Sequence, residues 1–111
     1  MLQLTVLIKR HPDLAIEEFH ERWRAHGRMI ADEPDFGMIR RYEQHHRAAA
    51  DYRNGDTYDG VAIQQYDDFD GFLAFLDAPA YAAKVRPDEQ TLLDVDALVV
   101  LFTEPAEVFI G

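Results

Sequence analysis

Apolar residues recur along this chain with two different periods, and the change of period predicts where strands and helices lie. Over residues 2–9 alternate positions are apolar (Leu2, Leu4, Val6, Ile8), which predicts a strand with one face toward the core. Over residues 16–30 the apolar positions recur every three or four residues, which predicts an amphipathic helix. Asp13, in the break between the two segments, is an early candidate for the helix N-cap.

The rest of the chain continues the alternation of strands and helices. The pattern predicts a polar strand over 38–46, a strand over 58–66, a helix over 69–76 capped by Asp67-Asp68, helical pieces over 79–85 and 87–93, a dense apolar strand over 97–102 suited to a sheet interior, and a final edge strand over 108–110. Asn54-Gly55-Asp56 marks a turn in an exposed segment. This order predicts one domain over residues 1–111, with a ferredoxin-like α+β fold whose four-stranded antiparallel sheet carries helices on one face.

A sheet covered on one face leaves its other face open. In a chain of 111 residues an apolar open face would be an association surface. A second copy of the chain would cover it most simply, so we expect a homodimer.

The amino-acid composition excludes or disfavours several classes of binding partner and of chemistry. The net charge of -10, from 21 acidic and 11 basic side chains, disfavours nucleic acid and anionic membranes as partners. The absence of cysteine excludes disulfides, thiolate nucleophiles and Cys-ligated zinc. The first ten residues do not resemble a signal peptide and no apolar run is long enough to span a membrane, so we expect a cytoplasmic protein.

Histidines supply the candidate chemistry. His26 lies in the apolar stripe of the first helix with Phe19 and Trp23, so a titratable ring faces the interior, either as a site or as a hydrogen-bonded core residue. In the strand over 38–46, alternation places one polar row on a single face: Arg40, Tyr42, Gln44 and His46. His45 points to the opposite face from His46, and Arg24 stands where a zincin motif beginning at His20 would need histidine, so no metal site is expected.

Five motifs occur in a characteristic order. They are Val6-Leu7-Ile8-Lys9-Arg10; Glu17-Glu18-Phe19 and Trp23 followed by His26-Gly27; Arg40-Arg41-Tyr42 with Gln44 and His46; Tyr58-Asp59-Gly60-Val61-Ala62; and Asp88-Glu89 with Leu93-Asp94. Together they resemble the EthD family (named for ethyl tert-butyl ether degradation) of the dimeric α+β barrel superfamily. The resemblance implies a ligand cavity between sheet and helices, where Trp23 and His26 face Tyr42, Gln44 and His46.

The chain departs from the family pattern at two positions that matter for activity. His26 follows Trp23 by three residues, where relatives usually have four, and Ile63 stands where many relatives carry a glutamate. We therefore favour His46 over His26 as the principal catalytic residue.

The resemblance implies a small enzyme that works without a cofactor. His46 and His26 would act as general acid and base on a hydrophobic, aromatic or polyketide-like molecule, leading to dehydration, cyclisation or a related rearrangement. The substrate-binding residues would be Trp23, Tyr42, Gln44, Arg40 and Tyr66, the last as a phenolic donor. Two alternatives stay open: haem held by a histidine in the same cavity, and a non-catalytic ligand-binding or accessory protein, which the missing carboxylate at Ile63 favours.

Overall fold

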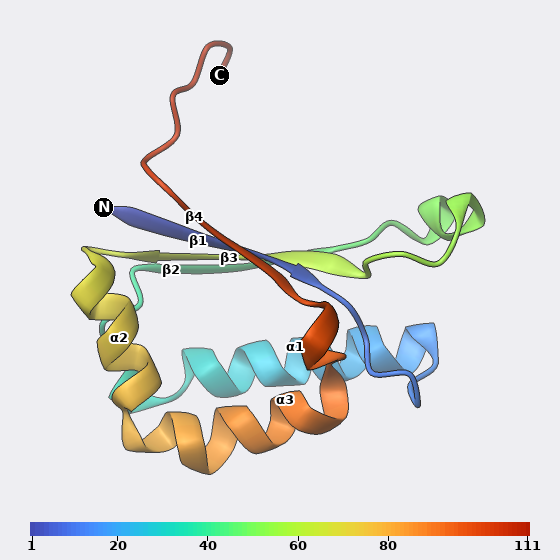
Figure 1. Ribbon diagram of the computed structural model, residues 1–111, viewed down its shortest axis with the longest axis horizontal. Coiled ribbons are helices and arrows are strands. Elements are labelled where there is room, and N and C mark those ends of the chain that lie inside the picture. The colour runs from blue at the N-terminus through green and yellow to red at the C-terminus, as the bar shows by residue number, and fades with distance from the viewer.

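The computed structural model describes residues 1–111 and arranges them in two layers, a sheet and a set of helices (Figure 1). The strands are β1 (Leu2–Ile8), β2 (Arg41–His46), β3 (Gly60–Tyr66) and β4 (Val99–Thr103), and the α-helices are α1 (Ile16–Ala31), α2 (Phe69–Asp77) and α3 (Arg86–Leu92). The sheet has the order β2-β3-β1-β4 and all neighbours are antiparallel. All three helices lie on one face of it, which confirms the predicted ferredoxin-like α+β fold (Figure 1).

The apolar stripe of α1 faces the sheet as its periodicity predicts. Phe19, Trp23, His26 and Ile30 are all buried. The N-cap is Ala15, whose side chain makes no capping hydrogen bond, so the prediction of Asp13 as the cap is wrong. The backbone N–H of Asp13 bonds instead to the His11 ring in the preceding turn.

Side-chain alternation sorts each strand into a helix-facing side and an open side. Leu4 and Ile8 of β1 are buried beneath the helices, as are alternate residues of β3 such as Ala62 and Tyr66. Three residues of β2 pair with residues of β3 whose side chains face the helices, so the β2 side chains face the helices too. The pairs are Tyr42 with Gln64, Gln44 with Ala62, and His46 with Gly60. Two apolar clusters fill the space between the layers, one around Tyr66 and Phe75 and the other around Phe19, Trp23 and Leu92.

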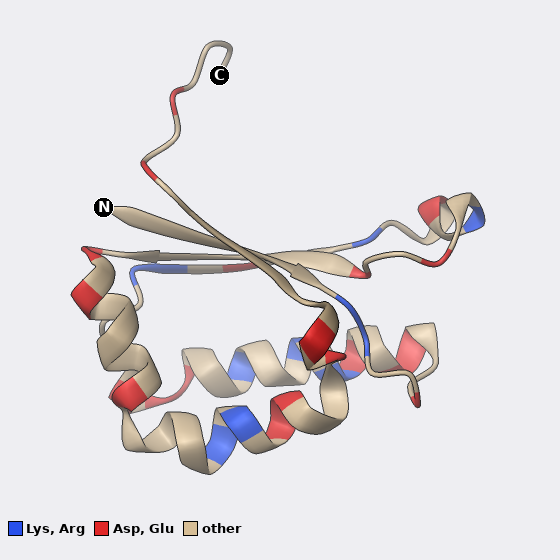
Figure 2. Ribbon diagram, in the orientation of Figure 1, with Lys and Arg blue, Asp and Glu red and all other residues tan.

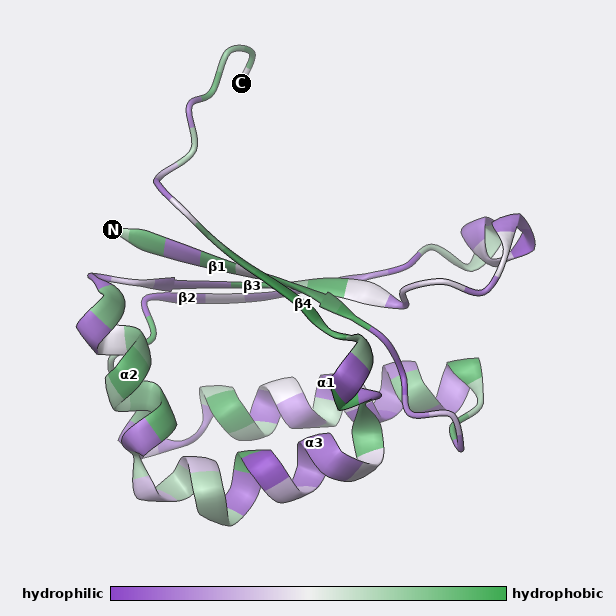
Figure 3. Cartoon of the chain, in the orientation of Figure 1, coloured by the Kyte–Doolittle hydropathy of each residue, from purple (hydrophilic) through white to green (hydrophobic).

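The dense apolar strand near the C-terminus lies at an edge of the sheet, not in its interior. β4 pairs only with β1, so the expectation of an interior strand is wrong for the single chain. Its continuous apolar character has another cause, because one side meets the helix layer through Phe102 while the other side lies on the open face, where Leu101 is 60% exposed. Figure 3 shows β4 as a strongly hydrophobic ribbon crossing the sheet.

The open face combines apolar side chains with an absence of charge on three of its strands. Leu7 of β1 pairs with Val61 and Val99, and Thr5 pairs with Ile63 and Leu101. No Asp, Glu, Lys or Arg occurs within β1, β3 or β4, and Figure 2 shows the charged residues gathered on the helices, loops and β2. The open face is therefore suited to association.

The helical segment before β4 is continuous where the sequence predicted two pieces. A π-helical turn, Tyr81–Val85, leads directly into α3. Pro87 at the start of α3 has no N–H to donate to the preceding turn, and the N–H of Arg86 bonds to the carbonyl of Tyr81, five residues back. The cap of α2 is as predicted, because the Asp68 side chain accepts a hydrogen bond from the N–H of Gly71.

Two segments project from the layers. The chain between β2 and β3 contains a 3-10 helix, Ala49–Asn54, and then Gly55 at φ 113°, a conformation that favours glycine. The C-terminal residues 104–111 run away from the sheet (Figure 1), and the edge strand predicted over 108–110 does not form.

No helix has the length and apolar character to cross a membrane.

Candidate functional site

A partly open cavity lies between the sheet and the helices, where the family resemblance implies a ligand cavity. We call it the inner cavity; its volume is about 230 Å³, and 15 of its 18 lining residues are hydrophobic. Trp23, Ile30, Tyr42, Phe75 and Leu93 are among them. The three polar exceptions are His26, Gln64 and Glu89. A cavity of this composition suits an apolar ligand oriented by a few polar groups.

His26, on the wall of the inner cavity, is paired with a carboxylate that lies behind it, outside the cavity lining. His26 is 6% exposed, and its Nδ1 lies 2.7 Å from Oδ2 of Asp88 on α3. The other Asp88 oxygen accepts a hydrogen bond of 3.1 Å from Arg22. A carboxylate on Nδ1 fixes the ring orientation and favours the tautomer with its proton there, which leaves Nε2 as the nitrogen available to a ligand.

A second acid–base pair borders the same cavity. The hydroxyl of Tyr81 donates to Oε1 of Glu89 at 3.0 Å. Burial raises the pKa of Glu89, which the Tyr81 hydrogen bond and His26 oppose. Burial also raises the pKa of Tyr81, to about 12, with a further contribution from the Glu89 charge. Desolvation therefore moves the pKa of Glu89 toward the range useful for proton transfer.

A second hollow, which we call the outer cleft, opens where α1 meets the segment after β2. Its volume is about 430 Å³, and its walls are Ile16, Glu17, His20, Arg24, His46, Arg47, Ala49 and Tyr52. Within it Nδ1 of His20 lies 2.7 Å from Nδ1 of His46, and Nε2 of His20 lies 2.8 Å from the Tyr52 hydroxyl. The two histidines come from α1 and the end of β2, so only the fold brings them together.

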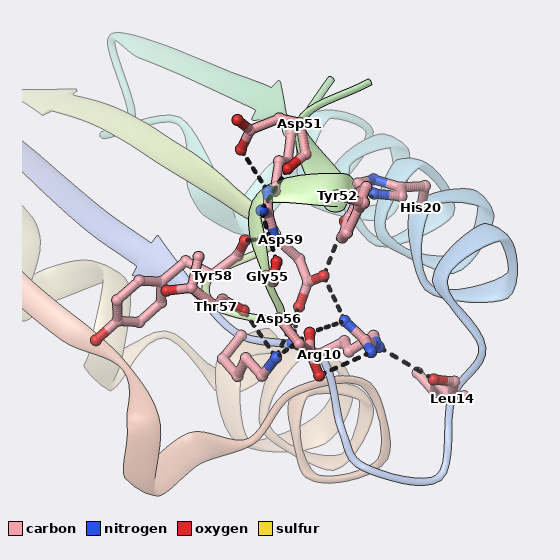
Figure 4. A network of polar contacts seen from close by, with 12 residues as sticks. Arg10, Leu14, His20, Asp51, Tyr52, Gly55, Asp56, Thr57, Tyr58 and Asp59 are labelled. Carbon is pink, nitrogen blue, oxygen red and sulfur yellow. Dashed lines mark hydrogen bonds and ion pairs between the residues drawn. The ribbon is translucent and has the colours of Figure 1, made fainter. Parts of the chain in front are cut away.

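A buried ion pair anchors the cleft (Figure 4). The Tyr52 hydroxyl donates to Oδ1 of Asp59 at 2.8 Å, and Asp59 is completely buried. Arg10 binds both carboxylate oxygens of Asp59, through Nη1 at 2.7 Å and its backbone N–H at 2.8 Å. These bonds hold Tyr52 in place and thereby orient His20.

The electrostatics of the cleft disfavour additional positive charge. Burial, Arg24 and His20 together lower the pKa of His46 to about 4. Burial also lowers the pKa of His20, with Arg24 and Arg10 contributing in the same direction. Both lowered pKa values keep the two rings neutral at pH 7.

The structure divides the predicted site residues between the two hollows. Trp23, His26 and Tyr42 line the inner cavity, whereas His46 lines the outer cleft and Gln44 lines neither. Gln44 lies between them, donating from Nε2 to the Trp23 carbonyl at 2.7 Å and facing His46 with Oε1 at 3.0 Å. The Trp23 ring, with its centroid 4.5 Å from that of His46, completes the partition. His26 and His46 therefore do not meet in one cavity.

Two predicted binding residues lie outside both hollows. Arg40 precedes β2 instead of belonging to it, and its guanidinium binds both oxygens of Asp67 at 3.0 and 2.8 Å. Tyr66 is fully buried and its hydroxyl donates to Gln64, so its hydrogen bond is already used within the protein. Ile63, where relatives carry glutamate, pairs with Thr5 and Glu43 on the open face.

Several site residues could not be assigned a role from the sequence. Asp59, Asp88 and Glu89 occur in the motifs that carry the family resemblance, but the motifs assign them no role. His20 enters only as the start of an incomplete zincin motif, and Tyr52 lacks a local pattern. Gly27 carries a signal that becomes clear only in three dimensions, because a Cβ there would lie 2.5 Å from Nε2 of Gln44. Glycine at this position lets β2 approach α1 closely.

Fold and cavity together define an α+β protein of the ferredoxin-like class with an internal ligand-sized space. Residues 11–96 match the model of the EthD domain, and the chain belongs to the EthD family. No curated protein matches the sequence.

Solved structures share the fold at low sequence identity. A dimeric protein of unknown function from Bacteroides fragilis is 17% identical with a TM-score of 0.71, over 93% of this chain and 94% of its own. A Dabb family protein from Mesorhizobium loti is 14% identical with a TM-score of 0.67, over 96% and 97%. SnoaB, a cofactor-independent oxygenase from Streptomyces nogalater, is 15% identical with a TM-score of 0.64, over 99% and 97%.

Proposed function

We propose that this protein is a cofactor-independent enzyme that transfers a proton on a small hydrophobic molecule bound in the inner cavity. The observation that carries the proposal is His26 on the wall of that apolar space, with its Nδ1 held by the Asp88 carboxylate. SnoaB, described as a cofactor-independent oxygenase, shares the fold and supports an enzymatic role.

The size of the inner cavity limits the substrate. A dry apolar cavity of about 150 Å³ accommodates benzene. The inner cavity, at about 230 Å³, therefore suits a substituted single ring of aromatic or polyketide-like character. A haem does not fit this space, because pockets for smaller, drug-sized ligands already measure roughly 300–1,000 Å³.

The lining groups suit proton abstraction next to a carbonyl, the step that begins many dehydrations and cyclisations. With Nδ1 held by Asp88, Nε2 of His26 acts as the general base, and the Asp88 carboxylate stabilises the imidazolium that forms. In its protonated form, which burial favours by raising the pKa, Glu89 would donate to the developing enolate oxygen. Two titratable groups in one cavity, His26 and Glu89, favour an enzyme over a non-catalytic accessory protein.

The test measures the proton transfer itself. The protein is incubated in D₂O with a panel of single-ring aryl ketones, and deuterium incorporation beside the carbonyl is followed by NMR. We expect exchange faster than the buffer rate, and His26→Gln should lower the enzymatic rate by roughly 10²-fold or more, the usual contribution of a general base.

His11→Gln is the matched control, because His11 lies outside the inner cavity in the turn before α1. It should leave the exchange rate unchanged, and circular dichroism should show that both variants are folded. Exchange at the buffer rate for every ketone, or an undiminished rate in folded His26→Gln, would rule out the proposal.

We also propose that the protein acts as a homodimer through its open face. Solved structures of the same fold from Bacteroides fragilis and Thermobifida fusca are described as dimeric. In this chain the uncharged strands β1, β3 and β4 present Leu101 and Val99 to solvent, and Phe109 beyond β4 is 89% exposed. A second copy would remove this apolar surface from water.

Sedimentation equilibrium tests the dimer. Leu101→Asp places a charge at the centre of the contact and should give monomers at concentrations where the wild type is dimeric. Leu73→Asp is the control, because Leu73 is 41% exposed but lies on α2, in the helix layer. A monomeric wild type, or equal dissociation of the two variants, would contradict the proposal.

A further inference from the structure

We propose that the outer cleft is a second ligand site, which binds a small aromatic carboxylate and takes up one proton on the His20–His46 pair as it does so. This inference goes beyond the proton-transfer function, because it concerns a different space. Trp23 and Gln44 separate the cleft from the inner cavity.

An unpaired cation marks the cleft. Of its two arginines, Arg47 is bound to Asp51 at 2.7 Å, whereas Arg24 makes no hydrogen bond or ion pair. Arg24 is therefore a cation in the wall of the cleft that none of the 21 acidic side chains neutralises. A carboxylate in the cleft would give Arg24 the partner that the protein does not supply.

The hydrogen bonds around the histidine pair require one proton more than the neutral groups contain. Tyr52 donates its only proton to Asp59, so its oxygen accepts from Nε2–H of His20. Nδ1 of His20 is then an acceptor, and it takes the Nδ1 proton of His46.

The missing proton belongs on the far side of His46. With its single proton on Nδ1, a neutral His46 faces Oε1 of Gln44 with an unprotonated Nε2, so two acceptors meet at 3.0 Å. Gln44 keeps this orientation because its Nε2 donates to the Trp23 carbonyl. One added proton on Nε2 of His46 completes every hydrogen bond in the chain from Gln44 to Asp59.

The charges around the pair explain why an anion must bring that proton. On α1 the pair faces Glu17 and Arg24, from the segment after β2 it faces Arg47 and Tyr52, and behind Tyr52 stand Asp59 and Arg10. Arg47 is paired with Asp51, and Arg10 is paired with Asp59. Burial and the repulsion from the unpaired Arg24 therefore keep His46 neutral. An anion that pairs with Arg24 removes that repulsion, so its binding and protonation of His46 favour each other.

The other walls of the cleft indicate an aromatic body on the ligand. Ile16, Ala49 and the Tyr52 ring supply apolar surface beside the cationic groups. The volume of about 430 Å³ lies within the range of roughly 300–1,000 Å³ that is usual for small-molecule sites. Benzoate is therefore a suitable probe, and benzamide is its neutral match in shape.

The experiment is calorimetric titration of the protein with benzoate at pH 5.5, repeated in buffers of different ionisation enthalpy and free of other carboxylates. At this pH His46 is neutral without ligand, and a coupling of about 100-fold between anion and proton, within the usual range of about 5–150-fold, suffices to protonate most of it. The dependence of the heat on the buffer counts the protons exchanged. We expect benzoate to bind with uptake approaching one proton, and benzamide to bind at least about tenfold more weakly because it lacks the charge.

Variants locate the site. Arg24→Gln should weaken benzoate binding at least about tenfold, the effect of losing a charge-assisted contact. Arg28→Gln, an exposed arginine one turn further along α1 and outside the cleft, should bind like the wild type. His46→Gln should bind without proton uptake.

Three results would overturn the proposal: no binding of benzoate, equal affinity for benzamide, or benzoate binding without proton uptake. An undiminished affinity in Arg24→Gln would do the same. Deuterium exchange in the inner cavity is a separate measurement, so failure of one proposal does not imply failure of the other.

Discussion

Replacing Asp59 by Asn tests whether the buried ion pair organises the outer cleft. Asp59 is completely buried and accepts hydrogen bonds from the Arg10 guanidinium, the Arg10 backbone N–H and the Tyr52 hydroxyl. Asparagine keeps one acceptor oxygen but places an NH₂ group against one of these donors, and it leaves the charge of Arg10 without its buried partner.

The size of the effect follows from the surroundings of Arg10. Removing one partner of a buried ion pair costs about 3–5 kcal/mol. Arg10 also contacts Asp56 at 3.0 Å, which retains part of the compensation, so the lower end applies. We expect a loss of about 3 kcal/mol in the free energy of unfolding, or ~10 °C in the melting temperature for a chain of this size.

The assay is urea denaturation at pH 7 and a fixed protomer concentration, because dimerisation would make stability depend on concentration. Asp56→Asn is the matched control, because it removes the charge of another carboxylate that contacts Arg10. The Asp56 side chain is 64% exposed, so the free energy of unfolding should fall by less than about 1 kcal/mol. Equal effects of the two variants, or a loss below about 1 kcal/mol for Asp59→Asn, would refute the reasoning.

The remaining predictions concern packing and pH. A Cβ at Gly60 would lie 2.5 Å from the Trp23 ring and 2.7 Å from the His45 carbonyl, so Gly60→Ala should cost about 1–3 kcal/mol in thermal unfolding. Gly37→Ala, where nothing lies within 4 Å, should be neutral or slightly stabilising, and equal melting temperatures would contradict this account. Because the pKa of His46 falls to about 4 in the folded protein, the unfolded chain binds more protons as the pH is lowered from about 6.5 toward 4, and stability decreases through that window. Since the ring is partly exposed, we expect the free energy of unfolding to fall by about 1 kcal/mol over this pH range because of His46. Urea denaturation of wild type and His46→Gln at a series of pH values measures this difference, and parallel stability curves would disprove it.

Local pattern was sufficient for most of the fold. Period-two alternation located β1 and β3, the stripe from Phe19 to Ile30 located α1, and Asp68 located the start of α2. The errors fall where local pattern competes with tertiary context. Residues 97–102 read as an interior strand because apolar residues occupy both faces, yet β4 is an edge strand with one face uncovered.

The candidate site was less predictable than the fold. Alternation placed Tyr42, Gln44 and His46 on one face of β2, and the family resemblance oriented that face toward the helices, as the register confirms. It did not tell which hollow each residue reaches, because that depends on the position of the Trp23 ring between them. Arg40 and Tyr66 had the expected residue types, but Asp67 and Gln64 already satisfy their polar groups.

The sequence by itself determined the order of elements, the helix-facing rows and the burial of His26, because these depend on periodicities within single segments. The tertiary structure decided which distant groups meet: His26 with Asp88 across 62 positions, His20 with His46 across 26, and Arg10 with Asp59 across 49. Neither periodicity nor composition encodes such pairings. They arise only when the sheet register and the packing of α1 against β2 and α3 fix the distances between side chains, and the acid–base chemistry that we propose depends on those distances.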